Sequence, residues 1–315
     1  MIELKELDSI PAGLLSADVT DLAKLLQQPT LLKLSGRKKE PLFVSTLLHG
    51  NEHSGFIAVQ QLLRKYQFEE LPRDLIVLIG NVQAATCNER TVGVDVDYNR
   101  IWDNPEKYPM VKRVHEVLQN DNVFALVDVH NNTGRNPHYS LISKLKPGDV
   151  GLASLFGRTV IHFVFPESAL SVFASRWLPA VTLEVGVSRD PVGIEKTIEY
   201  LDACLHLDHL QDSFPKPADI NLYYPLGRLS FREDVSFDFG LGTECDVYLR
   251  DDLDYLNFSP MQPGTQLGLS RISDPFVMID AYGKPLLDKK PIVVEGGKII
   301  VKESFVPAMF TRNKK

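Results

Sequence analysis

A histidine and a glutamate three residues apart give the strongest chemical signal in the sequence. His49 and Glu52 lie in the segment LHGNEHSG, which follows an apolar run and precedes a helix-like pattern. At such a bend both side chains can point at one metal ion, although the same pair is also common as a capping cluster at the start of a helix. Two histidines and one carboxylate, with a fourth position left for water, make a catalytic zinc site. The pair therefore needs one more ligand.

His130 offers that ligand in the segment DVHNN. The apolar run VFALVDV ends at His130, just as the earlier run PLFVSTLL ends at His49. Ligand sites of open α/β sheets lie beyond the carboxyl ends of the strands, so both imidazoles fall on the same sheet edge. The pattern predicts one Zn²⁺ per chain, held by His49, Glu52 and His130. Other first-row divalent metals remain open, because histidine and carboxylate ligands accept several of them.

Glu184 is a carboxylate inside an otherwise apolar strand, in the segment VTLEVG. An unpaired charge in such a place costs several kcal/mol, so the group has either a partner or a function. A salt-bridged glutamate at a strand end is the structural alternative. Near a metal-activated water, Glu184 is predicted to act as the general base, and a raised pKa would suit that role.

A polar segment from Asn81 to Trp102 follows the second predicted strand and carries two arginines. Arg90 and Arg100 have planar guanidinium groups that can bind an oxyanion and a substrate carboxylate. Taken alone, both would be solvated surface arginines. Their place beyond a strand end favours a role in the site.

A sheet must bring these residues together, and the chain has the pattern for one. Short runs rich in Val, Ile and Leu alternate with helix-like periodicity, which is typical of a largely parallel sheet. We predict a mixed, largely parallel α/β sheet flanked by helices. Its strands are expected at residues 41–48, 74–80, 123–129 and 179–185, and its helices at 56–66, 110–118 and 193–210.

The pattern changes after Ser213, where the segment SFPKPAD interrupts the helix-like periodicity. The remaining residues alternate short β-like pieces with turns such as MQPGTQLG and VEGGK. A chain of 315 residues also exceeds the usual size of one core. We therefore expect an α/β hydrolase domain over residues 1–214 and a smaller β-rich C-terminal domain over residues 215–315.

Composition excludes several classes of partner. The net charge of -7 comes without a basic block, so nucleic-acid binding is not expected. No apolar run reaches the ~18 residues of a membrane span, and the N-terminus has no signal-peptide pattern. Three widely spaced cysteines indicate a reducing compartment, with each expected to be buried as a small hydrophobic side chain. We expect a cytoplasmic protein, with homo-oligomerisation left open.

In combination, these motifs resemble the succinylglutamate desuccinylase and aspartoacylase family of the zinc carboxypeptidase clan. The similarity covers most of residues 40 to 205, and the β-rich tail also looks like the C-terminal domain of that family. The pieces that carry it are, in order, HGNEHSG, GNVQAA, DYNRIW, DVHNNTG and LEVG.

The resemblance implies a role for each matching position. The two histidines and Glu52 would hold zinc, and Glu184 would deprotonate the water. Arg90 would polarise the scissile carbonyl, while Asn99 and Arg100 would anchor a substrate carboxylate. Arg176, in SVFASRW, resembles the arginine of the family that binds the acyl-side carboxylate.

Two departures from the family bear on the substrate. The stretch between Arg90 and Asp97 is longer than in aspartoacylases. Aspartoacylases also bind their acidic substrate with a tyrosine in the C-terminal domain, and the corresponding segment GGKIIVKESF has none. N-acetylaspartate is therefore not the expected substrate.

The function expected from these features is zinc-dependent hydrolysis of the amide or ester bond of a small N-acyl amino acid that bears a carboxylate. One alternative is a zinc carboxypeptidase or peptide amidase that acts on peptides, and another is a metal-binding regulator without catalysis. The acyl group, the leaving group and the preference between amide and ester stay open.

Overall fold

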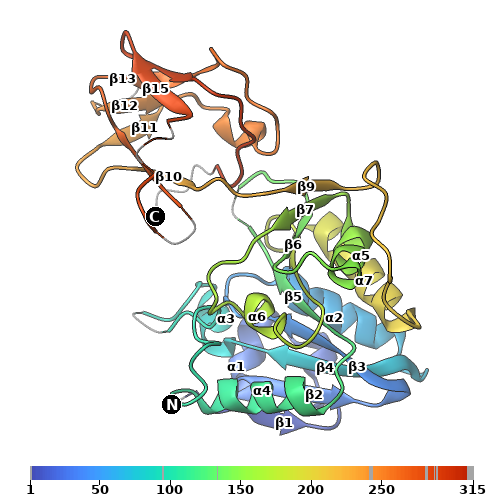
Figure 1. Ribbon diagram of the computed structural model, residues 1–315. Helices are drawn as coiled ribbons and strands as arrows, with labels where there is room; N and C mark the ends of the chain where they lie inside the picture. Colours follow the sequence, from blue (N-terminus) through green and yellow to red (C-terminus); the bar gives the residue numbers. More distant parts are fainter. Residues whose placement is uncertain are drawn as a thin grey trace. The chain divides into compact units, whose positions relative to one another are not determined.

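The computed structural model describes residues 2–93, 96–132, 134–240, 244–280, 283–286, 288 and 290–310. The chain forms two compact units, drawn in Figure 1. The first comprises Met1–Asn132 and His138–Tyr224, and the second comprises Thr133–Pro137 and Pro225–Lys315. The expected boundary after residue 214 falls earlier than this division. The reason is that β9 (Asn221–Tyr223) still pairs with β7 (Thr159–His162) of the first unit.

The first unit is built on a nine-stranded sheet of order β1-β2-β4-β3-β5-β8-β6-β7-β9. Neighbouring strands run parallel except at the β2–β4 and β6–β8 pairs. The predicted mixed, largely parallel α/β sheet is therefore confirmed. The other strands are β1 (Lys5–Leu7), β2 (Thr30–Leu34), β3 (Gly36–Thr46), β4 (Leu71–Ile79), β5 (Ala125–His130), β6 (Tyr139–Ile142) and β8 (Ala180–Glu184).

Helices cover both faces of this sheet, and successive strand residues supply the two cores. In β3, Val44 packs into the core shared with α2 (Ser54–Lys65), α5 (Pro147–Phe156) and α7 (Pro191–His206). The preceding residue, Phe43, packs into the core shared with α4 (Pro109–Asn120) and α6 (Leu170–Ala174). Side chains alternate across a strand, so a sheet covered on both faces needs the continuous apolar runs seen in the sequence. Two shorter helices, α1 (Leu22–Leu26) and α3 (Val82–Cys87), complete this unit.

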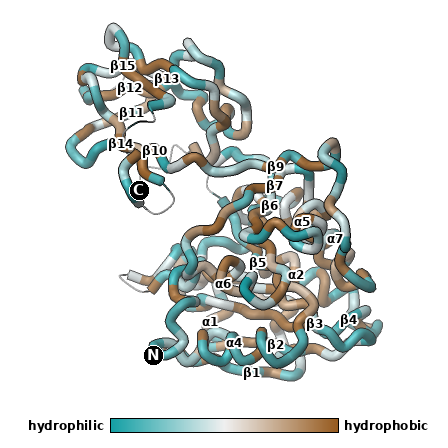
Figure 2. Tube along the Cα trace, in the orientation of Figure 1, coloured by the Kyte–Doolittle hydropathy of each residue, from teal (hydrophilic) through white to brown (hydrophobic). Residues whose placement is uncertain are grey.

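The second unit is β-rich and has its own core. Its strands form a five-stranded sheet of order β11-β12-β13-β16-β15 and a β10–β14 pair. Figure 2 shows apolar residues along strands of each unit. The core of the second unit includes Val247, Leu267 and Ile299. The strands are β10 (Arg228–Phe231), β11 (Phe237–Phe239), β12 (Val247–Leu249), β13 (Gln266–Ser270), β14 (Phe276–Ile279), β15 (Ile292–Glu295) and β16 (Lys298–Val301).

The segment Thr133–Pro137 belongs to this second unit although the first unit precedes and follows it in the chain. The backbone N–H of Met309 donates to Oδ1 of Asn136 at 3.2 Å. The guanidinium of Arg135 lies 4.2 Å from the ring centre of Tyr255. These contacts tie the segment to the C-terminal part of the chain.

Two features outside the sheets complete the description. Cys204 and Cys245 are buried as expected, whereas Cys87 is exposed because it lies in the last turn of the short helix α3. Among the helices of the described residues, none has the length and apolar character that a bilayer crossing requires.

Candidate metal centre and active site

The candidate residues of the first unit follow the carboxyl ends of three neighbouring strands. His49 lies just after β3, and Glu52 precedes α2 in the same bend. His130 ends β5, Glu184 ends β8, and the two are register partners across this parallel pair. The bend after β3 is tight against α3, because a Cβ at Gly50 would lie 2.2 Å from a backbone carbon of Ala84. Glycine is therefore required for this approach.

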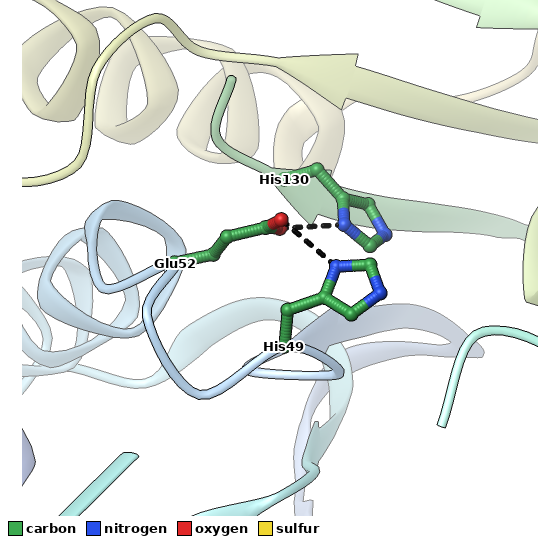
Figure 3. A group of neighbouring side chains, drawn as sticks. All are labelled: His49, Glu52 and His130. Atoms are coloured by element: carbon green, nitrogen blue, oxygen red, sulfur yellow. Dashed lines mark hydrogen bonds and ion pairs between the residues drawn. The ribbon is translucent and has the colours of Figure 1, made fainter. Parts of the chain in front are cut away.

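His49, Glu52 and His130 form one buried cluster, shown in Figure 3. The Nδ1 atoms of both histidines face the carboxylate of Glu52. Nδ1 of His49 lies 2.8 Å from Oε1, and Nδ1 of His130 lies 2.7 Å from Oε2. The candidate ligand atoms all lie within 4.8 Å of one another. Two imidazole nitrogens and one carboxylate that converge from different elements match the donor set of a catalytic zinc site. Within the described residues this is the one group with such an arrangement.

An aspartate contacts the outer nitrogen of each imidazole. Nε2 of His49 lies 3.0 Å from Oδ1 of Asp97, and Nε2 of His130 lies 2.9 Å from Oδ2 of Asp128. A carboxylate on the outer nitrogen fixes the orientation of a ligating histidine and raises its basicity. The sequence pattern predicts a role for neither aspartate. The signal for Asp128 was its spacing, because it lies two positions before His130 and hence on the same face of β5.

The charges in the cluster are mutually stabilising. Burial alone would raise the pKa of Glu52, but the two imidazoles outweigh it and hold that pKa well below its usual range. Burial would likewise lower the pKa of His130, yet the carboxylates of Asp128 and Glu52 raise it well above the ordinary value. Metal ligands must be deprotonated, so a cation bound here would take the place of the His130 proton.

Glu184 has a different environment. Burial of its carboxyl, together with the charges of Glu52 and Asp128, raises its pKa to about 8, against the opposing effects of His130 and Asn132. Its Oε2 atom is buried and has no hydrogen-bond partner among the described residues. The proximity of Glu184 also helps burial to raise the pKa of Tyr139, its register partner in β6. A buried carboxyl with a raised pKa and one unpartnered oxygen is typical of a catalytic acid or base.

The segment from Arg90 to Arg100 also contacts the cluster. Nη2 of Arg90 donates to Oδ2 of Asp97 at 2.9 Å, and its Nη1 lies 3.8 Å from Oε1 of Glu52. Asn99 is buried, with its amide nitrogen 3.2 Å from Nε2 of His130 and its Oδ1 accepting from the N–H of Leu170 at 2.9 Å. Arg100 is exposed and donates to the carbonyl of Asn99 at 2.7 Å. The structure therefore brings Arg90 and Asn99 to the cluster and Arg100 next to Asn99.

Arg176 lies elsewhere. Its guanidinium pairs with Glu167 at 3.2 Å and lies 4.6 Å from the ring centre of Phe173. The first residue of α6, Leu170, contacts Asn99, whereas Arg176 follows the last turn of α6 and precedes the start of β8. Glu184 is at the other end of that strand. No contact within the described part of the chain supports the expected role of Arg176 at the acyl-side carboxylate.

Comparison with known proteins agrees with this geometry. Residues 39–188 match the family model described as succinylglutamate desuccinylase/aspartoacylase catalytic domain. A search of curated protein sequences finds no match.

Several solved structures share the fold at low sequence identity. The succinylglutamate desuccinylase from Silicibacter sp. TM1040 has a TM-score of 0.55 at 15% identity, covering 89% of this chain and 84% of its own. The succinylglutamate desuccinylase from Chromobacterium violaceum has a TM-score of 0.52 at 17% identity, covering 87% of each chain. The ectoine utilization protein EutE (DoeB) from Ruegeria pomeroyi has a TM-score of 0.52 at 16% identity, covering 89% and 88%.

The residues that match the family model contain the buried His-Glu-His cluster and the strand that carries Glu184. The first unit thus has a hydrolase fold of this type, with a cluster able to hold a metal ion. Residues 39–188, which carry this cluster, belong to the succinylglutamate desuccinylase/aspartoacylase catalytic-domain family.

Proposed function

We propose that this chain is a zinc-dependent hydrolase that cleaves the amide or ester bond of a small N-acyl amino acid bearing a carboxylate. One observation carries the proposal. Two imidazole nitrogens and a carboxylate converge in a buried cluster, and the carboxyl of Glu184, with one oxygen unpartnered among the described residues, ends the neighbouring strand. A structural zinc site would be closed by a fourth protein ligand, whereas a catalytic site keeps that position for water or substrate.

The residues present fit the metal. His49, Glu52 and His130 would hold it, and Asp97 and Asp128 already orient the two rings from outside. When bound, zinc supplies Lewis acidity, which lowers the pKa of water and polarises a carbonyl oxygen.

Glu184 is proposed to transfer the proton. Without a cation its pKa is about 8, so the carboxyl is mostly neutral at pH 7. Positive charge at the cluster favours the ionised form and brings this pKa down. The carboxylate can then accept a proton from water and return it to the leaving amine or alcohol.

The arginines are proposed to recognise negative charge. Arg90 lies beside the cluster and is partly exposed, so its guanidinium can leave Asp97 to stabilise the oxyanion that develops on the scissile carbonyl. Arg100 is exposed next to Asn99, and these two residues are proposed to bind a substrate carboxylate. Family likeness supports N-succinylglutamate and related N-acyl amino acids as the first substrates to test.

The test is a hydrolysis screen of the zinc-loaded protein with N-succinylglutamate, N-acetylaspartate, other N-acyl amino acids, small esters and short peptides. Preference for an N-acyl amino acid supports the proposal, and preference for peptides supports a carboxypeptidase or peptide amidase instead. No turnover across the screen by a protein that binds zinc would favour a non-catalytic regulator.

Glu184→Gln tests the proton transfer directly. The variant keeps the size of the side chain and all three proposed ligands. We expect unchanged zinc content and a kcat lower by about 10²- to 10⁴-fold, which is the usual contribution of a general base. Glu195→Gln, the same substitution at an exposed position of α7, is the matched control. A Glu184→Gln variant with zinc and near-full turnover would refute the assignment.

A further inference from the structure

Asn131 lies between the segments that carry the proposed base and one of the proposed ligands. It follows His130 and is buried. Its backbone N–H donates to Oε2 of Glu52 at 3.2 Å. Its side-chain Oδ1 accepts from the N–H of Ser54 at 3.1 Å, and its Nδ2 donates to the hydroxyl of Ser54 at 3.0 Å. Asn131 is therefore bonded both to the carboxylate of Glu52 and to Ser54, the first residue of α2.

The same amide also reaches the strand exit beyond Glu184. Nδ2 of Asn131 donates to the carbonyl of Gly186 at 2.8 Å, and the N–H of Asn132 donates to the same carbonyl at 3.0 Å. Gly186 has a φ of 80°, a conformation that glycine adopts without cost. The backbone therefore turns immediately after β8, and Asn131 holds this turn at the Gly186 carbonyl.

Ser54 continues the connection from the other side. Its hydroxyl, fully buried, accepts from the backbone N–H of Arg189 at 2.9 Å. Asn131 and Ser54 thus form a bridge that links three strand exits: the bend with Glu52, the end of β5 with His130, and the segment 184–189 that begins with Glu184. The bridge lies outside the ligand set and contains no group that ionises near neutral pH.

We propose that Asn131 is a positioning residue that fixes the segment of Glu184 against the metal-binding bend. The inference rests on the proposed function for its catalytic consequence, but the bridge itself exists independently of activity. In a hydrolase the base must be held in reach of the proton it accepts, so loosening this segment lowers kcat while substrate binding is retained. The proposed ligands keep their own contacts when the side-chain amide of Asn131 is lost.

Asn131→Asp is the sharpest test. The aspartate keeps the backbone N–H to Glu52 and an oxygen for the N–H of Ser54, but it replaces the donor to Gly186 with an acceptor. Asn131→Ala removes this bond and both side-chain bonds to Ser54 without adding charge. Ser54→Ala leaves the Asn131–Gly186 bond in place but removes the acceptor of the Arg189 N–H. Asn104→Asp is the control for added charge, because Asn104 is exposed and its side-chain amide donates to Asp103.

Each variant is measured in three ways: hydrogen exchange of the peptides 49–54 and 185–190, zinc affinity by chelator competition, and kcat and KM on the best substrate of the screen. For Asn131→Asp we expect faster exchange in 185–190 and unchanged exchange in 49–54. For Asn131→Ala we expect faster exchange in both peptides, because the N–H of Ser54 also loses its acceptor, with zinc affinity unchanged. Both variants should lower kcat by about 10- to 100-fold at constant KM. Ser54→Ala should speed exchange of the Arg189 N–H, whose acceptor it removes, with a smaller fall in kcat.

Other outcomes overturn the inference. Unchanged exchange in 185–190, or faster exchange with unchanged kcat, removes the positioning role. A joint loss of zinc affinity places Asn131 in support of the ligands instead, and a raised KM at constant kcat makes it a substrate contact. If the wild-type protein turns over none of the substrates, the proposed function has failed, and exchange together with zinc affinity still decides whether the bridge holds this segment.

Discussion

The two ends of the central strands bury charged side chains in opposite ways. At the start of β4, the guanidinium of Arg73 is 1% exposed and donates to the carbonyls of Glu40 and Leu207 at 2.6 Å each. Lys38, its register partner in β3, donates to the carbonyls of His206 and Leu207. The carbonyls of His206 and Leu207 close α7, and the C-terminal end of a helix carries partial negative charge. Backbone carbonyls thus bind both cations, and each cation also lies near one carboxylate, Lys38 at 2.6 Å from Asp208 and Arg73 at 3.7 Å from Glu40.

At the carboxyl ends of the same sheet, charged groups face one another instead. Glu52 binds two imidazoles, each imidazole binds an aspartate, and one oxygen of Glu184 has no partner among the described residues. The pKa values of His130 and Glu184 are both raised, so both groups hold a proton that a bound cation would displace. The difference shows how one sheet separates tasks: charges at one end stabilise the fold, and charges at the other end are available to a ligand.

Arg73→Met should give the largest loss of stability. The substitution keeps an apolar stem but removes the donor to the carbonyl of Glu40 and leaves the carbonyl of Leu207 to Lys38 alone. An unsatisfied buried group costs about 1–3 kcal/mol, so we expect the free energy of unfolding to fall by that amount, with zinc affinity and kcat unchanged. Urea unfolding of the purified variant checks this. A large loss of zinc binding by a folded variant would contradict the separation of the two ends.

Asp128→Asn should have the opposite profile. The amide keeps the shape of the side chain but no longer offers a carboxylate to Nε2 of His130. We expect zinc affinity to fall by about 10- to 100-fold, as for other outer partners of ligating histidines. Stability of the metal-free protein should change less than in Arg73→Met. Chelator competition and urea unfolding measure both quantities, and equal zinc affinity in variant and wild type would remove Asp128 from the site.

Zinc binding should also release protons, and this is the smallest of the three effects. The raised pKa of His130 keeps its ring charged in the metal-free protein, which stabilises the fold below the ordinary pKa and less as pH rises through the raised value. The Glu184 carboxyl, with a pKa of about 8, is also protonated at pH 6. We expect release of about one to two protons per zinc and tighter binding as pH rises.

Calorimetric titration at pH 6 in buffers of different ionisation enthalpy gives the proton count. Glu184→Gln is the matched variant, since it removes one titrating carboxyl and keeps His130. The number of protons released per zinc should be lower in this variant than in the wild type by the share that Glu184 contributes. Absence of any proton release would contradict the charged state assigned to His130.

Much of the sheet could be predicted from the sequence, because a strand buried on both faces must be apolar throughout. The runs at residues 41–48, 74–80, 123–129 and 179–185 all correspond to strands, with ends shifted by a few residues. The antiparallel neighbours β2 and β6 and the short helices α1, α3, α5 and α6 were not predicted. Short elements bury little surface of their own and depend on tertiary packing, so their local pattern is weak.

The candidate site was predictable to the extent that it follows strand ends. His49, Glu52 and His130 converge as expected, and Glu184 pairs in register with His130. Asp97 and Asn131 could not be assigned a place, because loop residues approach the cluster only through the path of the chain. Arg176 follows the last turn of α6, whereas the first residue of α6 contacts Asn99, and the role of Arg176 at the acyl-side carboxylate stays a prediction.

The segment Thr133–Pro137 has a consequence for the modularity of the chain. The polypeptide passes from the first unit to the second after Asn132, returns at His138, and passes again after Tyr224. Three covalent crossings join the units, so a single protease cut after Tyr224 would leave part of the second unit attached to the fragment that holds His130. A fragment that begins at Pro225 would therefore lack the contacts that Arg135 and Asn136 make with Tyr255 and Met309.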